Sequence, residues 1–153
     1  MTAQASEKII IDYEEYNLLC EPLASYLEEK KLEFDWSHTA CWRGYAGTWE
    51  LKDKQLYLIG FAGKIKGEAV DLKFLFPDAI KDDSNIAFPS YSVKADWFTG
   101  HLRIAIGDMI QYVHAGYSSL YSDEMIIEVE QGNVVKTSFK HNEYDERLED
   151  MPF

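Results

Sequence analysis

Hydrophobic and polar residues alternate along much of the chain with the period of two that is typical of β-strands. The first such segment covers residues 8–20, where the polar stretch 12–15 predicts a turn between two short strands. The second covers residues 42–51 and 55–62, which a polar Lys-Asp-Lys sequence separates. Because only a few polar residues join each pair of apolar runs, we expect two antiparallel hairpins.

Two further strand pairs are predicted in the second half of the chain. Residues 91–98 and 101–106 alternate on either side of a Thr-Gly sequence, which suits a tight turn. Residues 125–130 and 134–139 alternate on either side of a polar turn that contains glycine. Between these pairs and the earlier ones, the Asp-, Ser- and Asn-rich stretch 81–89 predicts a loop.

One segment has helical periodicity instead. Residues 22–31 begin with a proline, which suits the first turn of a helix, and they place Leu23, Tyr26 and Leu27 on one face. The short apolar run at residues 72–76 ends at a proline and is not predicted to be helical. We therefore predict an α+β fold, with about eight to ten short strands in a curled, mainly antiparallel sheet and one short N-terminal helix.

The composition supports one globular domain over residues 1–153, because 46% of the residues are hydrophobic and 14% are aromatic. Cys20 and Cys41 do not form a CxxC pair, so we expect two free thiols in a reducing, cytoplasmic environment. No run approaches the roughly 18 apolar residues of a membrane span, and the N-terminus lacks the apolar core of a signal peptide. The acidic residues 143–153 predict a frayed C-terminal tail.

Charge is the strongest signal in the composition, since 27 acidic against 15 basic residues give a net charge of −12. Nucleic-acid binding is disfavoured because phosphate contacts need clusters of lysine and arginine. A basic protein is the expected partner, although acidic clusters on a soluble protein can also be nothing more than a solvated surface. The candidate partner-binding residues are Asp82, Asp83, Asp123, Glu124, Glu143, Asp145, Glu146 and Glu149.

Two blocks, residues 41–50 and 95–104, combine tryptophan with glycine and contain one arginine each. Glycine lets backbones approach closely, and tryptophan buries a large area. An arginine beside aromatic residues usually has a planar or anionic partner, so the blocks fit either a structural ion pair or a ligand pocket. The candidate pocket residues are Arg43, Tyr45, Asp96, Trp97, His114 and Tyr117.

His114 is the most suggestive single residue for catalysis, because two serines and a glycine follow it closely. No carboxylate has a defined place beside it, however, and the chain has no Gly-x-Ser-x-Gly sequence, so we expect a hydrogen-bonded histidine that fixes a bend. His38 and Cys41 have the spacing of zinc ligands only once, without a second pair. We therefore predict no catalytic residue, no metal and no cofactor.

Longer strings in the chain are also distinctive. They include Trp42-Arg43-Gly44-Tyr45, Leu75-Phe76-Pro77, Ala95-Asp96-Trp97-Phe98-Thr99-Gly100 and Tyr112-Val113-His114-Ala115-Gly116-Tyr117. Together they resemble a family of small bacterial proteins without an assigned activity, over residues 9–135. This chain departs from the family at residues 105–107, where relatives tend to carry a proline-containing turn, and in its acidic C-terminal extension. The resemblance implies a single-domain cytosolic protein and no catalytic residues, and small proteins of this kind are often encoded beside secreted toxins as immunity partners.

The charge, the size and the resemblance lead to one main hypothesis. The protein is expected to be a cytoplasmic immunity protein that masks the active site of a cognate toxin domain, with carboxylates steering a basic partner. The alternative is a small-ligand-binding protein or enzyme that uses a pocket around Arg43, Asp96, Trp97 and His114. A third possibility is a subunit of an assembly in which exposed aromatic residues pack against copies of the chain.

Overall fold

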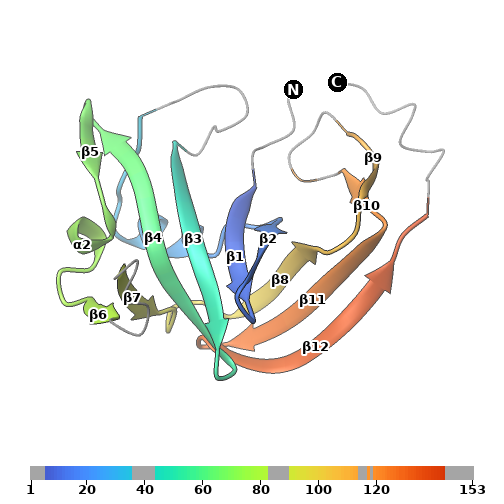
Figure 1. The fold of residues 1–153 in the computed structure, drawn as a ribbon. Helices are drawn as coiled ribbons and strands as arrows, with labels where there is room; N and C mark the ends of the chain where they lie inside the picture. The colour runs from blue at the N-terminus through green and yellow to red at the C-terminus, as the bar shows by residue number, and fades with distance from the viewer. Residues whose placement is uncertain (1–5, 36–43, 83–89, 114–116, 118, 144–153) are drawn as a thin grey trace.

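The computed structural model describes residues 6–35, 44–82, 90–113, 117 and 119–143. Strands dominate this part of the chain, and two short helices accompany them (Figure 1). The elements are, in order, β1 (Glu7–Ile11), β2 (Glu14–Leu18), α1 (Ala24–Glu29), β3 (Tyr45–Lys52), β4 (Gln55–Ile65), β5 (Glu68–Val70), α2 (Leu72–Leu75), β6 (Ile80–Asp82), β7 (Ser90–Lys94), β8 (Gly100–Ala105), β9 (Met109–Gln111), β10 (Leu120–Tyr121), β11 (Asp123–Glu130) and β12 (Asn133–His141).

The main sheet curls until its two sides meet. Its strands follow the order β12-β11-β8-β2-β1-β3-β4, and Asn133 of β12 also pairs with Gln55 of β4, so seven strands form a closed barrel. Strand β1 runs parallel to β3, whereas the other neighbours in the barrel are antiparallel. In Figure 1 the strands fan out from the end where the β3–β4 and β11–β12 turns lie. The predicted curled, mainly antiparallel sheet is therefore confirmed, although helices contribute less than an α+β class implies.

Three of the predicted hairpins are present, namely β1–β2, β3–β4 and β11–β12. The first two turn at Asp12-Tyr13 and at Asp53-Lys54, and all four of these residues have a positive φ between 51° and 68°. Two consecutive residues with positive φ form the turn whose twist matches that of the flanking strands. The two-residue turns thus keep each hairpin in the register that its apolar alternation requires.

The predicted pairing of residues 91–98 with 101–106 is wrong. Strand β7 pairs with β4 and β6, whereas β8 pairs with β11 and β2. The residues between them cross from one side of the barrel to the other, because the Ala95 N–H donates to the Leu56 carbonyl at 2.8 Å and the Phe98 carbonyl accepts from the Gly132 N–H at 3.0 Å. These contacts with distant turns hold residues 95–99 in a crossing segment instead of a hairpin.

Helix α1 confirms the helix predicted at residues 22–31, with fewer residues, and it buries Leu27 against the core. Helix α2 was not predicted. It forms because the Asp71 side chain accepts a hydrogen bond from the Phe74 N–H at 3.1 Å, which caps the first turn of the apolar run. The single predicted helix is therefore corrected to two, both close to the aromatic side chains around Trp97.

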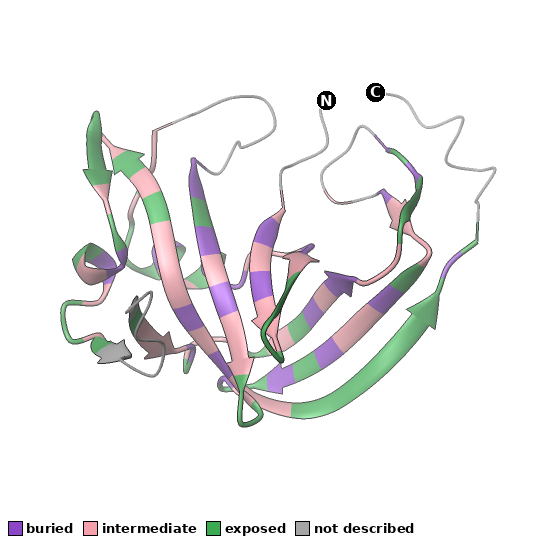
Figure 2. Ribbon diagram, in the orientation of Figure 1, coloured by how far each residue is buried: buried purple, intermediate pink, exposed green. Residues whose placement is uncertain are grey.

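The core fills the inside of the barrel. Buried and more exposed residues alternate along β1, β3, β8 and β11, as Figure 2 shows, so one face of each strand points inward. The inward residue of β1 nearest its start is Glu7, whose carboxylate accepts hydrogen bonds from the Gly47 N–H at 2.7 Å and from Trp49 Nε1 at 3.0 Å. The largest fully buried apolar side chains are those of Ile9, Leu18, Leu23, Trp49, Leu56, Leu58, Leu102, Ile104, Ile127 and Val129.

Candidate protein-docking surface

Trp97, one of the predicted pocket residues, has a clear structural role. Its indole Nε1 donates to the Pro22 carbonyl at 2.9 Å. Its ring centroid lies 5.1 Å from that of Tyr26 and 5.2 Å from that of Phe76, with which it stacks. Trp97 therefore fixes the crossing segment to the regions of both helices.

Tyr45 belongs to a different aromatic cluster. It is buried in β3, and its ring centroid lies 5.3 Å from that of Phe34 and 5.6 Å from that of Phe61. Asp96 points into solvent, where its carboxylate lies 3.8 Å from the Lys94 amine. Tyr45 and Trp97 thus belong to two different aromatic clusters, and Asp96 lies on the surface. Arg43 and His114 lie outside the described residues, and the carbonyl of Tyr117 accepts a hydrogen bond from Arg103.

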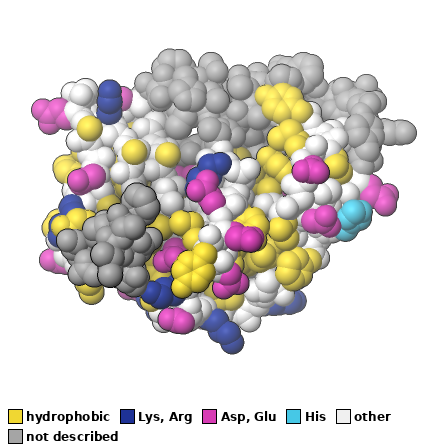
Figure 3. Space-filling view, in the orientation of Figure 1, with side chains coloured by type: hydrophobic (Ala, Val, Ile, Leu, Met, Phe, Trp, Pro, Cys, Tyr) yellow, Lys and Arg dark blue, Asp and Glu magenta, His cyan; other side chains and the backbone are white. Residues whose placement is uncertain are grey.

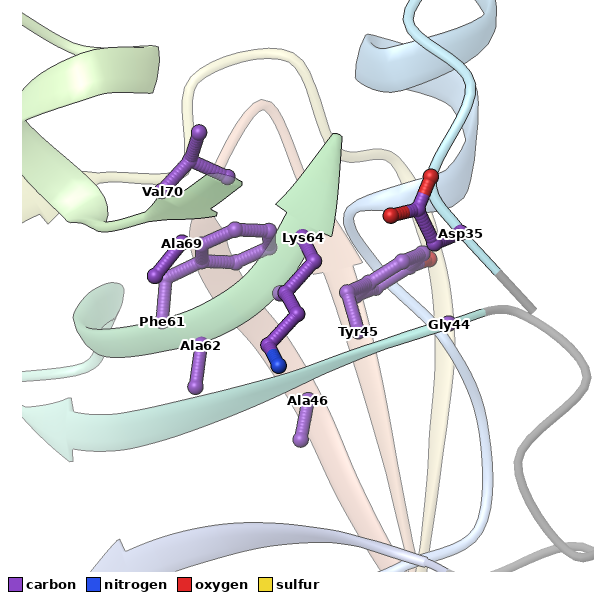
Figure 4. A pocket seen from close by; sticks show the side chains of 10 residues that line it. Asp35, Gly44, Tyr45, Ala46, Phe61, Ala62, Lys64, Ala69 and Val70 are labelled. Carbon is purple, nitrogen blue, oxygen red and sulfur yellow. The ribbon is translucent and has the colours of Figure 1, made fainter. Parts of the chain in front are cut away.

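A pocket of about 640 Å³ opens beside the Tyr45 cluster (Figure 4). Its walls come from the start of β3, the end of β4 and β5, and the sticks in Figure 4 show the Lys64 side chain between the aromatic and alanine side chains. Asp35 lies at its edge, where the carboxylate accepts from the N–H groups of Lys66 and Gly67 at 2.9 and 2.7 Å. The volume suits a small molecule, and the lining offers apolar contacts with one amine.

Glu124 was predicted to bind a partner, and the structure overturns this prediction. Its side chain is 2% exposed and forms an ion pair with Arg103, whose Nε donates to Glu124 Oε1 at 2.6 Å. Asn142 Nδ2 donates to the second oxygen at 2.9 Å. Neighbouring side chains on a strand point to opposite faces, so Asp123 remains in solvent while Glu124 is covered. The role of Glu124 is structural.

Asp123 and Glu143 are exposed, as a partner-binding role requires. Asp123 Oδ1 lies 3.0 Å from His141 Nδ1, and this hydrogen bond, followed by the charge of Asp123, raises the pKa of the histidine. Asp82 is the last residue of β6, and its side chain is outside the description. The remaining predicted partner-binding residues, Asp83, Asp145, Glu146 and Glu149, lie outside the described residues.

The most prominent surface feature is the tip of the β1–β2 hairpin, which the sequence predicted only as a turn. The tip of the β1–β2 hairpin carries Asp12, Tyr13, Glu14 and Glu15, all exposed, and the Tyr13 side chain is 99% exposed. We call these four residues the acidic hairpin tip. The available signal was the order of residue types, an aromatic ring enclosed by three carboxylates between two alternating strands.

The acidic hairpin tip is held by its neighbours. The Tyr16 hydroxyl donates to Glu14 Oε2 at 2.8 Å, and this hydrogen bond raises the pKa of Tyr16. In the neighbouring β3–β4 turn, exposed Lys52 and Lys54 flank an aspartate, so the negative charge is concentrated on the β1–β2 hairpin. Figure 3 shows carboxylates interspersed with apolar side chains over the face that presents this hairpin. Such a surface combines electrostatic steering with an aromatic anchor.

Two further observations concern other kinds of site. In the described part of the chain, no group of three or more His, Cys, Asp or Glu side chains is arranged to hold a metal ion. None of the helices described has the length and apolar character that crossing a membrane requires.

Comparisons with known proteins add no identity. No family model, no curated protein and no solved structure matches the chain. The family resemblance drawn from the sequence therefore stays a prediction.

Proposed function

We propose that this protein is an acidic binding module of the immunity type, which acts in the cytoplasm by docking on a basic toxin domain and masking its active site. The observation that supports the proposal is the acidic hairpin tip, where the fully exposed ring of Tyr13 lies among three carboxylates. Tyrosine is enriched among the residues that dominate binding energy at protein interfaces. Carboxylates around such a ring accelerate encounter with a cationic surface.

The two parts of the tip have separable roles in this proposal. Asp12, Glu14 and Glu15 raise the association rate, and their effect weakens as salt screens the charges over about 8–10 Å. The Tyr13 ring contributes mainly to the lifetime of the complex, because it is desolvated only after docking. A protruding two-residue turn can enter a concave active site, which a flat acidic surface cannot.

The test is survival of bacteria that express the C-terminal domain of the protein encoded directly upstream, with and without this chain. We expect rescue by the wild type. Replacing Tyr13 with glycine removes the ring and relaxes the left-handed turn, so folding is preserved while affinity falls by roughly tenfold or more. The triple change Asp12→Asn, Glu14→Gln and Glu15→Gln lowers the association rate and its dependence on salt.

The matched control neutralises three exposed carboxylates elsewhere. Glu28, Glu29 and Glu33 lie in and just after α1 and are exposed, so changing all three to glutamine alters the net charge by the same amount. We expect this control to keep most of the association rate. Equal losses in the two triple variants would show that only overall charge matters, and failure of the wild type to rescue would overturn the proposal.

A second candidate function, small-ligand binding, is supported by the 640 Å³ pocket. Its apolar walls and the Lys64 amine fit an apolar molecule that carries a carboxylate. Screening such acids by thermal shift, with Lys64→Met as the comparison, tests this candidate. Stabilisation of the wild type that the variant lacks supports it, and equal behaviour of both proteins contradicts it.

A further inference from the structure

Strand β12 has one open edge. Along one side it pairs with β11 over its whole length. Along the other side, Asn133 pairs with Gln55 and the Val134 N–H donates to the Lys54 carbonyl at 2.9 Å, after which β12 pairs with no other described strand. Every residue from position 135 to 141 is exposed, and Figure 2 shows this stretch in the exposed colour. Unpaired backbone groups along such an edge can accept another strand.

The pairing with β11 shows which backbone groups face the open edge. Beyond a bulge at Val135 this pairing is regular. The Asn142 N–H donates to the Ser122 carbonyl at 3.0 Å, so position 142 is hydrogen-bonded toward β11. In an antiparallel pair, residues alternate between facing the neighbour and facing away. The backbone groups that point to the open edge are therefore those of Thr137, Phe139 and His141.

The exposed part of β12 is positively charged, although the net charge of the chain is −12. Residues 135–141 contain two lysines and a histidine and no acidic residue. The hydrogen bond to Asp123 raises the pKa of His141, which favours its protonated form. The Phe139 side chain in the same stretch is 72% exposed. A strand that brings carboxylates and apolar side chains therefore complements this edge.

The two lysines differ in how far β11 balances their charge. Lys136 lies opposite the exposed Glu128, which supplies a carboxylate nearby. Lys140 lies opposite Glu124, but that carboxylate forms an ion pair with Arg103. An acidic side chain on the open side of β12 therefore gains most near Lys140.

The segment that follows β12 has the complementary composition. Residues 143–153 contain five acidic residues and one arginine, together with apolar side chains that include Leu148 and Met151. Residues 144–153 lie outside the described residues. At about 3.3 Å per residue, positions 145–151 span roughly 23 Å when extended, which is the length of positions 135–141 in a strand. Pro152 has no N–H to donate, so it suits the end of such a strand.

We propose that residues 145–151 fold back antiparallel to β12 and cover its open edge as an added strand. Positions 142–144 then form the connection, and three residues is a common length for a hairpin loop. Residues next to the loop meet the end of β12, so Asp145 and Glu146 come close to Lys140. The tail that the sequence predicted to be frayed is then ordered, and its carboxylates serve β12. This proposal does not depend on the acidic hairpin tip.

Covalent attachment favours the tail over other occupants of the edge. A short connection gives a tethered segment an effective concentration in the millimolar range. A second copy of the chain at micromolar concentration therefore competes at a disadvantage of about a thousandfold. A second β12 would also bring two more lysines to an edge that already carries two, whereas the tail brings carboxylates.

Amide hydrogen exchange of the full chain, measured by NMR, tests the pairing. We expect slow exchange at the three N–H groups of the open edge, and NOE contacts between the Phe139 ring and residues 145–151. Changing both Glu146 and Glu149 to proline removes two N–H groups. Because these positions alternate in direction, one of them faces β12 in any register. In this variant we expect the open-edge amides to exchange at least about tenfold faster and the NOE contacts to be lost.

Two controls accompany this measurement. The amides of β12 that point to β11 keep their partners, so we expect them to exchange slowly in both proteins; they are those of Lys136, Ser138 and Lys140. The matched variant Glu146→Gln with Glu149→Gln removes the same two charges and keeps both N–H groups. We expect it to retain most of the protection. Equal acceleration in the glutamine and proline variants would overturn the proposal, because charge and not strand pairing would then hold the tail.

Two further outcomes would contradict the proposal. Fast exchange at Thr137, Phe139 and His141 in the wild type would show that the edge is uncovered. Slow exchange at these residues in both the wild type and the proline variant would show that something other than the tail covers the edge. Sedimentation velocity of the same samples would then show whether a second copy of the chain is the occupant.

Discussion

Replacement of Glu124 by glutamine tests the assignment of this residue to the interior. The change preserves the size of the side chain and removes its charge. In the wild type the carboxylate accepts hydrogen bonds from Arg103 Nε and Asn142 Nδ2, and it forms an ion pair with the Arg103 guanidinium. Glutamine has only one oxygen that can accept from these donors. Its NH2 group takes the place of the second carboxylate oxygen, so one donor then faces another donor.

The magnitude follows from the burial of the two partners. Removing one partner of a fully buried ion pair costs about 3–5 kcal/mol. The Arg103 side chain is 27% exposed, so water can hydrate part of the guanidinium and the loss lies at the lower end, about 3 kcal/mol. For a chain of this size each kcal/mol lowers Tm by roughly 3 °C, which predicts a decrease of about 9 °C.

Urea unfolding followed by tryptophan fluorescence gives the free energy, and calorimetry gives Tm. The matched control is Glu128→Gln, because Glu128 lies four residues along the same strand, on the same face, and is exposed opposite Lys136. We expect the control to change stability by no more than about 0.5 kcal/mol. If Glu124→Gln costs as little as the control, the buried ion pair is not a stabilising element and the reasoning fails.

Three other predictions concern single groups. Asp123→Asn lowers the pKa of His141 toward its ordinary value, and an NMR titration of the imidazole ring measures the shift. Because Asp123 favours the protonated histidine, the stabilisation that this pair gives the folded protein is complete below the unfolded pKa of His141 and is lost as the pH rises through the folded pKa. Burial raises the pKa of the Cys20 thiol to about 11, so iodoacetamide at pH 8 labels Cys20 much more slowly in the folded protein than in urea, as peptide mass spectrometry reports. Gly132→Ala is expected to destabilise the protein more than Gly67→Ala in urea unfolding. Both glycines have a positive φ, but only at Gly132 would the new methyl group lie 2.8 Å from a backbone oxygen, so equal losses of stability would contradict this prediction.

Local patterns predicted the parts of the fold that local interactions determine. The alternation around residues 8–20 defined both strands of the first hairpin, because a two-residue turn keeps partners close in sequence. The same pattern failed at residues 91–106. Whether residues 95–99 close a hairpin or cross the barrel depends on the carbonyl of Leu56 and the N–H of Gly132, which lie far away in the sequence.

For the candidate site, too, local patterns in the sequence predicted only what local interactions determine. Alternation correctly places Asp123 and Glu124 on opposite faces, but it does not say which face is covered. The answer depends on Arg103 in β8 and Asn142 after β12, whose side chains meet only in the folded barrel. The closure of the barrel through Asn133 and Gln55 is likewise a contact between distant turns. Of the acidic pair predicted to bind a partner, Asp123 is therefore exposed and Glu124 is structural.

The conformation of Tyr13 supports a binding role that stability does not explain. Its φ of 68° lies in the left-handed region, which costs a residue with a side chain about 1 kcal/mol relative to glycine. Burial usually compensates for such strain, but this ring is 99% exposed and gains nothing from the core. Glycine or asparagine in the same turn gives the same hairpin at lower cost. The positive φ agrees with the proposed docking role of the ring, and on that proposal Tyr13→Gly is expected to raise stability while it weakens binding.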